Sequence, residues 1–339
     1  MRSDMHKWHL LRRTVFILVA AVALAVVVTF LPDKPYERFQ LLDTTIYARA
    51  RWSFERMHFD PRPIDVAIVG DSKAVLGLRS PEIERRLASD GKRALVVNMA
   101  LEGDGRNQQW ILVQELLKTK KPKVIVLAIN DRPYPWGHDS FRYIAPASEI
   151  WREAFHGLHD TKKNLMFLPF RQLKLFAASL LPGPFGLQER FDAARYAAQP
   201  DDPTQPHRNR KGELIDFAET RPRALLLREA RDNAAEFDRR SKLPERVRAI
   251  TDADDRVFTD LIVHAAHQHG AEVLFVYQPA FHRPAPIVNR AYYQALGPVQ
   301  DDVDLADRDG LYYDWVHLNT AGAMILSDRV ADSLSKMLP

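Results

Sequence analysis

The chain has 339 residues, of which 46% are hydrophobic and 27% are charged, and its formal net charge is +4. A chain of this length and apolar content can bury one large core or two smaller ones, which argues against a largely disordered protein. The charge balance is only mildly basic, and no basic stripe is interleaved with aromatic residues, so no nucleic-acid partner is expected. The absence of cysteine excludes disulfides, thiolate metal sites and cysteine nucleophiles.

The N-terminal region predicts a membrane anchor. Residues 1–13 form a basic tail, and residues 14–31 form an uncharged, mainly aliphatic run. At about 1.5 Å of helical rise per residue this run spans roughly 27 Å, which is close to the ~30 Å hydrocarbon core of a bilayer. The segment therefore has the length that a single membrane crossing requires.

Both a cleaved signal peptide and an uncleaved signal anchor begin in this way. The apolar core of a signal peptide is typically about 7 to 15 residues and ends at a small-x-small site. Here the run ends in Phe30-Leu31-Pro32-Asp33, so the anchor is favoured. The positive-inside rule places the N-terminus in the cytoplasm and the rest of the chain outside it. In a Gram-negative cell this predicts a single-pass inner-membrane protein whose main domain is periplasmic.

Residues beyond the anchor alternate between strand and helix patterns. Residues 33–62 are expected to form a stalk or first helix, because aromatic and charged positions recur at helical spacing. The expected strands cover residues 64–69, 94–97, 123–129 and 272–277. One helix is expected after Pro81, and three others are expected over residues 108–118, 254–269 and 320–337. Strands that alternate with helices predict an α/β fold with a parallel sheet that is covered on both faces.

About 140 residues between the third and fourth strands lack this rhythm, which is far more than a crossover connection needs. We expect residues 132–253 to form a largely helical insertion. Within it, residues 162–187 are apolar and basic. This stretch is open to three interpretations: it lies on the membrane surface, it covers a functional site, or it forms a helical subdomain with its own core.

A serine follows the first predicted strand. Gly70-Asp71-Ser72 places a hydroxyl at the carboxyl edge of the sheet, where open α/β folds build their sites. The alternative is a turn in which Asp71 or Ser72 only caps the next helix. A nucleophilic serine needs a general base and a group that orients this base.

Asp314 and His317 supply such a pair just before the last predicted helix. The loop can direct the imidazole toward Ser72 while the carboxylate accepts the second ring N–H. In the alternative interpretation Asn319 or Thr320 caps the helix and His317 is an incidental loop residue.

Two further strand ends are candidates for an oxyanion hole, which acyl transfer requires. Asn98 to Gly103 follows the second strand, and the glycine allows a backbone N–H to approach a reacting carbonyl. Asn130 follows the third strand, where its side-chain amide can point inward. An asparagine at such a position can also be an ordinary turn residue.

Taken in order, these segments resemble the SGNH or GDSL-like hydrolase superfamily, which is named after the Ser, Gly, Asn and His of four sequence blocks. The resemblance covers residues 64–131 and 272–336. It implies a three-layer flavodoxin-like parallel sheet, the SGNH hydrolase fold, within a catalytic domain over residues 63–339.

The resemblance also implies a role for each block residue. Ser72 is expected to be the nucleophile and one backbone oxyanion donor, with Gly103 and Asn130 as the other two donors. His317 and Asp314 are expected to be the base and its orienting partner.

The sequence departs from the family pattern at three positions. Ala100 and Ala128 stand where family members usually carry glycine, and Lys73 follows the serine directly, so the full G-D-S-L block is not reproduced.

Metal and cofactor sites are not expected. His264, His267 and His269 cluster near a predicted helix end, but no carboxylate ligand pattern accompanies them. The segment from Gly103 to Arg106 lacks the Lys and Ser/Thr of a phosphate-binding loop.

An anchor followed by such a domain resembles proteins that add or remove acyl groups on surface polysaccharides, such as alginate-type O-acetylases and teichoic-acid D-alanylation proteins. These often work beside a membrane-bound O-acyltransferase. We therefore expect a membrane-anchored periplasmic serine acylesterase or O-acyltransferase that acts on cell-envelope polysaccharide through an acyl-serine intermediate. The alternatives are a lipid-directed esterase or lysophospholipase, and an inactive scaffold that partners a membrane-bound O-acyltransferase.

Overall fold

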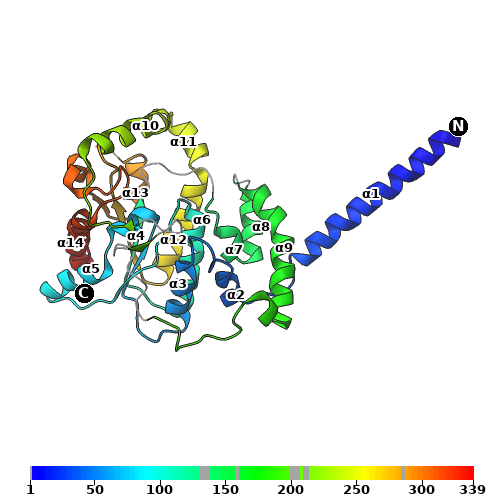
Figure 1. Cartoon of the computed structure of the whole chain (residues 1–339), viewed down its shortest axis with the longest axis horizontal. Coiled ribbons are helices and arrows are strands. Elements are labelled where there is room, and N and C mark those ends of the chain that lie inside the picture. The colour runs from blue at the N-terminus through cyan, green and yellow to red at the C-terminus, as the bar shows by residue number, and fades with distance from the viewer. Residues whose placement is uncertain (1, 130–136, 157–159, 198–206, 209–213, 284–286) are drawn as a thin grey trace. The chain divides into compact units, whose positions relative to one another are not determined.

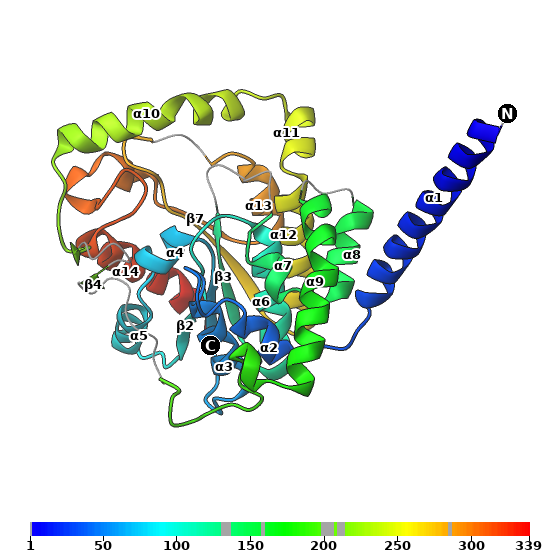
Figure 2. The ribbon, with the colours of Figure 1, turned by 45° about the vertical axis from the view of Figure 1, so that its right-hand side comes forward.

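The computed structural model describes residues 2–129, 137–156, 160–197, 207–208, 214–283 and 287–339. The chain divides into two compact units. Unit 1 comprises residues 1–41 and 142–191, and unit 2 comprises residues 42–141 and 192–339. Figure 1 labels helices of both units, and Figure 2 also labels several of the strands.

Unit 2 contains a parallel sheet of five strands, which confirms the predicted α/β class. The strands are β1 (Val66–Val69), β2 (Val96–Asn98), β3 (Val124–Ile129), β6 (Glu272–Tyr277) and β7 (Val299–Asp301), and they lie in the order β2-β1-β3-β6-β7. Val66 pairs with Val96 on one side and with Val124 on the other. The edge strand β7 is not among the predicted strands, because its Val-Gln-Asp sequence is only half buried and carries no aliphatic run.

Helices connect and cover these strands. In unit 2 they are α3 (Arg49–His58), α4 (Ser72–Gly77), α5 (Ser80–Ser89), α6 (Arg106–Thr119), α10 (Arg223–Ser241), α11 (Glu245–Thr251), α12 (Ala253–Gln268), α13 (Arg290–Leu296) and α14 (Thr320–Met337), with short 3-10 turns η2 (Val303–Asp307) and η3 (Asp309–Leu311). A two-residue pair, β4 (His207–Arg208) and β5 (Leu214–Ile215), forms a separate antiparallel ladder. The expected bounds agree with α6, α12 and α14 to within two residues.

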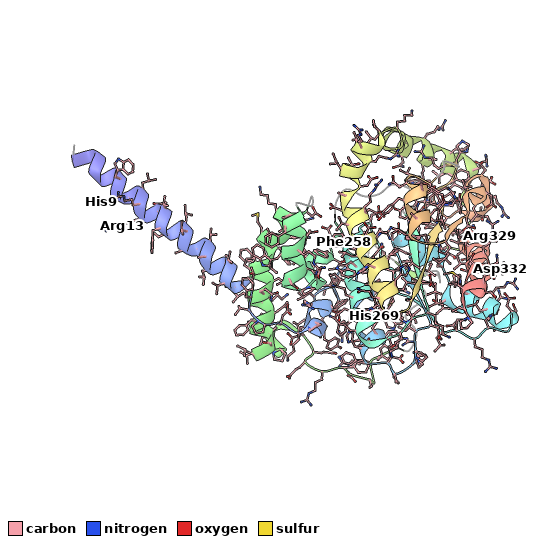
Figure 3. All side chains as sticks on the ribbon, turned by 180° about the vertical axis from the view of Figure 1, so that it is seen from behind. His9, Arg13, Phe258, His269, Arg329 and Asp332 are labelled. Carbon is pink, nitrogen blue, oxygen red and sulfur yellow. The ribbon has the colours of Figure 1, made fainter. Side chains whose placement is uncertain are left out.

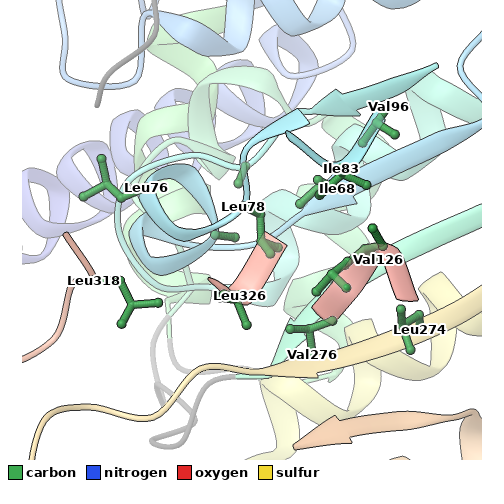
Figure 4. Packing of buried hydrophobic residues seen from close by; sticks show 14 of the residues in the cluster. Ile68, Leu76, Leu78, Ile83, Val96, Val126, Leu274, Val276, Leu318 and Leu326 are labelled. Atoms are coloured by element: carbon green, nitrogen blue, oxygen red, sulfur yellow. The ribbon is translucent and has the colours of Figure 1, made fainter. Parts of the chain in front are cut away.

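Alternate strand residues form the main core. Ile68, Val126 and Val276 point toward Leu326 of α14 in Figure 4, in a cluster that also includes Ile83 of α5. The strand residues between them are fully buried as well, including Ala67, Ile125, Leu127 and Phe275. Helix α6 contacts β1 and helix α12 contacts β6, beside the strands in Figure 2. Both faces of the sheet are therefore buried, as expected for parallel strands with continuous aliphatic sequences.

Residues 33–62 form two short helices rather than one. Helix α2 (Pro35–Gln40) belongs to unit 1, whereas α3 belongs to unit 2, where Phe54 and Met57 are buried and the helix contacts α6. The apolar positions of α3 therefore contribute to the core of unit 2.

Unit 1 combines the N-terminal helix with a helical hairpin. Helix α1 (Arg2–Val28) contains a 21-residue segment, Trp8–Val28, that is long and apolar enough to cross a membrane and that is not buried in the fold. Its side chains, such as His9 and Arg13, project freely in Figure 3. This helix is a candidate membrane span or signal sequence. The hairpin consists of α8 (Ala147–His156) and α9 (Thr161–Leu180), between the four-residue α7 (Phe141–Ile144) and the 3-10 turn η1 (Gly183–Phe185).

The stretch over residues 162–187 is thus mainly the helix α9, and one of its faces packs on a core. Leu168, Leu175 and Ala178 are fully buried. The buried guanidinium of Arg171 donates from Nη1 to the carbonyl of Ala145 at 2.7 Å and to that of Arg142 at 2.8 Å. These bonds satisfy a cation that would otherwise be costly to bury.

The packing of α14 gives a stability prediction. Leu334 is fully buried in the main core, so Leu334→Ala should lower the free energy of unfolding by about 2 to 5 kcal/mol through lost burial and the cavity left behind. Met324 lies on the exposed side of the same helix, and Met324→Ala should change it by less than about 0.5 kcal/mol. Denaturant unfolding of both variants in detergent tests this; equal effects would contradict the assigned burial of α14.

Candidate active site

Ser72 lies where β1 ends. The strand gives way to Gly70 and Asp71, and Ser72 is the first residue of α4. Its neighbouring strands β2 and β3 lie on opposite sides of β1, which is the position in an open parallel sheet where ligand sites form. A Cβ atom on Gly70 would lie 2.7 Å from the Cβ atoms of both Ala74 and Ala128, so only glycine fits there.

Asp71 caps helix α4. Its Oδ1 accepts hydrogen bonds from the N–H groups of Lys73 at 3.0 Å and Ala74 at 3.4 Å. The capping role that was an alternative to catalysis at this turn thus belongs to Asp71. The Ser72 N–H is outside this cap, and the Ser72 hydroxyl has a different partner.

That partner is His317. Its Nε2 lies 2.9 Å from Ser72 Oγ, and its Nδ1 lies 2.8 Å from Asp314 Oδ2. An ionised carboxylate only accepts hydrogen bonds, so Nδ1 carries a proton and Nε2 is the ring nitrogen that faces the serine hydroxyl. The structure therefore brings together the three residues that the sequence predicts as a triad, with the atoms in the order that proton transfer from serine requires.

The carboxylate of Asp314 is held by its own loop. Burial disfavours its charged form, but the hydrogen bond and charge of His317 and the N–H groups of Val316 and His317, which donate to Oδ1 at 2.8 and 2.7 Å, outweigh this and lower the pKa of Asp314. Asp314 is consequently ionised at neutral pH and can stabilise an imidazolium.

Asn319 caps the following helix at the same time. Its side chain accepts from the N–H of Gly322 at 3.0 Å and donates to the carbonyl of Gly310 at 2.9 Å. The capping interpretation of this loop is thus correct for Asn319, and it coexists with a histidine that faces Ser72.

Three residues that the sequence analysis did not identify brace the loop. Gln278, just after β6, donates from Nε2 to the carbonyl of Val316 at 3.1 Å. Phe281 donates its N–H to the carbonyl of Trp315 at 2.7 Å, and Glu229 of α10 accepts the N–H of Trp315 at 3.3 Å. The first two follow a strand end, which is a usable sequence signal, whereas Glu229 lies within the predicted insertion and has none.

Lys73 has a structural partner in the same region. It is buried, and its Nζ donates to the carbonyl of Gln278 at 3.3 Å. The lysine that departs from the resembled sequence block therefore connects α4 to the end of β6.

The loop after β2 lies beside the end of β1, the strand that precedes Ser72. Leu101 donates its N–H to the carbonyl of Gly70 at 3.2 Å. Asn98 donates from Nδ2 to the carbonyls of Ala74 and Leu78, both at 2.8 Å. These bonds bring the loop that contains Gly103, whose φ is +88°, next to the segment that contains Ser72. Asn130, the third expected oxyanion donor, lies outside the described residues.

His138 holds this loop in place and was not predicted. The N–H of Ser140 donates to its Nδ1 at 3.0 Å, so the ring proton is on Nε2, which donates to the carbonyl of Glu102 at 2.7 Å. Burial lowers the pKa of His138 to about 4, so the ring is neutral at pH 7. The Glu102 carbonyl and the Gly103 N–H belong to one planar trans peptide and point in opposite directions. His138 therefore fixes the direction of the N–H that is the expected second oxyanion donor.

A buried ion pair lies near the same edge of the sheet. Arg106 donates to Asp255 at 3.2 Å and to the carbonyl of Ala128 at 3.0 Å, and Asp255 also accepts from the hydroxyl of Tyr293 at 2.9 Å. A small pocket there is lined by Asp71, Asp104, Gly105, Arg106, Gln109, Ala128 and Asp255.

Metal ligation has no cluster to support it in the part of the chain that the structure describes: no three His, Asp or Glu side chains group there as ligands would. Of the three helix-end histidines, His264 contacts Gln268, and His269, labelled in Figure 3, contacts the carbonyl of Ala265.

The neutral state of His138 gives a pH prediction. Its folded pKa of about 4 is below the ordinary value near 6.5, so the unfolded chain binds more protons between these values and stability falls as pH falls through this window. His138→Gln removes this titration. The stability difference between wild type and variant should therefore shrink by on the order of 3 kcal/mol from pH 7 to pH 4. Denaturant unfolding at both pH values tests this, and a difference that does not change would contradict the assigned neutral ring.

Comparisons with known proteins add little to this geometry. No protein-family model matches the sequence, and no curated protein matches it. Among solved structures, the crystal structure of TesA is similar over 80% of this chain and 99% of its own, with 14% sequence identity and a TM-score of 0.38.

Proposed function

We propose that the chain is a membrane-anchored serine acylesterase or O-acyltransferase of the SGNH type. The observation that carries this proposal is the line of hydrogen bonds from Ser72 Oγ through His317 to Asp314, at 2.9 and 2.8 Å. A hydroxyl, a neutral imidazole and an ionised carboxylate in this order can generate a serine nucleophile at neutral pH.

The proposed reaction uses these groups twice. Ser72 Oγ attacks the acyl carbonyl while its proton passes to Nε2 of His317, and the leaving alcohol then takes that proton and departs. The acyl group remains on Ser72 as an ester. Water or a second hydroxyl attacks this ester and gives its proton to His317, which passes it to Ser72 Oγ as the ester bond to the serine breaks. The N–H groups of Ser72 and Gly103 and the amide of Asn130 are the proposed oxyanion donors.

Two features of the fold support the SGNH assignment. The five parallel strands lie in the order β2-β1-β3-β6-β7. Numbered one to five along the chain this is 2-1-3-4-5, which is the order of flavodoxin-like sheets. The acid and base lie three residues apart on a loop that enters the last helix, as the resemblance in sequence implies. A three-layer SGNH fold accounts for both features together.

The cellular setting follows from α1. If this helix remains as an anchor with its basic end in the cytoplasm, unit 2 is held in the periplasm close to the inner membrane. Acylated cell-envelope polysaccharide is then the proposed substrate, and a membrane-bound O-acyltransferase is the proposed partner. The alternative of an inactive scaffold would be favoured by a large Ser72–His317 separation, and the observed 2.9 Å does not support it.

A fluorophosphonate probe tests the nucleophile. Ser72→Ala should abolish labelling, and His317→Gln or Asp314→Asn should slow it by about 10⁴-fold, because the first removes the general base and the second removes the carboxylate that orients the imidazole and stabilises its charged form. Ser89→Ala is the matched control, since Ser89 is exposed on α5, and it should label at the wild-type rate. Normal labelling of the Ser72 variant, with its fold intact by circular dichroism, would refute the proposal.

Acyl-chain preference separates glycan from lipid substrates. Incubation with an activated acetyl ester should give an acetylated protein by intact-mass spectrometry, and the added mass should be absent from the Ser72→Ala variant. A site that fits an acetyl group and has no room for a longer acyl chain should turn over acetyl esters at least about tenfold faster than long-chain esters. A strong preference for long-chain esters would instead support the lipid-directed alternative.

A further inference from the structure

Helix α9 has two apolar faces on opposite sides. The inner face, with Leu168, Leu175 and Ala178, is buried in unit 1. The outer face consists of Met166, Phe170, Leu173, Ala177 and Leu180, which we call the outer stripe. Successive spacings of four and three residues place these five on one line along the helix.

The outer stripe is exposed in the fold. Met166, Phe170, Leu173 and Leu180 retain 65%, 74%, 54% and 66% of their accessible surface. A continuous row of large apolar side chains is unusual on a water-exposed surface and marks an interaction site. The inner face already supplies the packing that holds α9 in unit 1, so folding of this unit does not require the outer stripe.

The stripe is attached to the end of the candidate membrane span. Gln172 on α9 donates from Nε2 to the carbonyl of Leu31 at 2.8 Å, and Trp151 on α8 donates to the hydroxyl of Thr29 at 3.3 Å. Leu31 is three residues beyond Val28, where the apolar segment ends. At about 1.5 Å per residue Leu31 is therefore roughly 5 Å along the chain from the end of the span, within the ~5 to 8 Å of a headgroup layer, and α9 is hydrogen-bonded to it.

The charges at the edges of the stripe suit lipid headgroups. Lys162, Lys163 and Lys174 are exposed on or beside this face, and no Asp or Glu occurs from Thr161 to Leu180. Lysines flanking an apolar helix face can extend to anionic phosphates while the apolar residues enter the acyl boundary.

We propose that the outer stripe lies in the headgroup and upper acyl region of the membrane that α1 spans, so that unit 1 is held by a spanning helix and by a helix lying on the bilayer surface. This inference rests on the proposed anchoring by α1. It adds an interaction surface with a lipid partner, which is the interpretation of residues 162–187 that the sequence leaves open.

Single-cysteine labelling tests this directly, because the chain has no native cysteine. An environment-sensitive fluorophore is attached to the full chain at Phe170→Cys or Leu173→Cys. The labelled protein is then reconstituted into vesicles of phosphatidylcholine with phosphatidylglycerol. Nitroxide lipids labelled near the headgroup should quench both probes by at least about half. Ser89→Cys on α5 is the exposed reference with which quenching at the outer stripe is compared.

Two further probes separate the possible failures. Quenching of a probe at Val22→Cys within α1 by deep nitroxides reports whether the anchor spans the bilayer. Quenching at Val22 without quenching at Phe170 and Leu173 would overturn the proposal for the outer stripe. Fluorophosphonate labelling of Ser72 in the same samples reports on the proposed enzyme independently of both results.

A charge test distinguishes the contribution of the lysines. Lys162→Gln/Lys163→Gln/Lys174→Gln should reduce quenching at Phe170 in vesicles that contain phosphatidylglycerol and leave it nearly unchanged in pure phosphatidylcholine. The Phe170→Gln variant with its probe at Met166→Cys should lose quenching in both. Undiminished quenching in that variant would contradict a role for the apolar side chains.

Discussion

The hydrogen bond between Ser72 Oγ and His317 Nε2 joins residues 245 positions apart in the chain, and the proposed chemistry depends on it. One hydrogen bond would not hold two such distant segments together unaided, because the entropy cost of ordering the chain exceeds the gain from that bond. The contact exists because a parallel sheet brings strand ends to one edge, and because α14 packs on the same core as β1. The short loop before α14 is fixed by the carboxylate of Asp314, which accepts hydrogen bonds from the loop's own N–H groups. The imidazole of His317 is therefore oriented before any substrate arrives.

This dependence explains what the sequence could predict. Buried parallel strands require aliphatic residues on both faces, so β1, β3 and β6 stand out as uninterrupted apolar runs, and α14 as an amphipathic stripe with Asn319 before it. Ser72 and His317 were identifiable because each follows or precedes such an element directly. Strand β7 was missed because an edge strand that is half buried needs no apolar run.

Two supporting residues were not predictable for a different reason. His138 and Glu229 act through a carbonyl or an N–H group of residues distant in the chain, and such bonds impose no pattern on neighbouring residues. The two faces of α9 were hidden in a similar way. In sequence, a helix with apolar residues on two opposite faces has the same pattern as a segment that is apolar all round. Only the fold shows which of the two faces is buried.

The residues that depart from the resembled motif take part in the packing around Ser72. A Cβ atom at position 70 would collide with the Cβ atoms of both Ala128 and Ala74, so Gly70 is required beside Ser72. The ammonium of Lys73 reaches the Gln278 carbonyl while the Gln278 amide holds Val316 in the histidine loop. A residue that interrupts the motif thus belongs to the same chain of contacts that positions His317. The geometry of a site of this kind is set by such contacts, and a motif records only the part of them that is local in sequence.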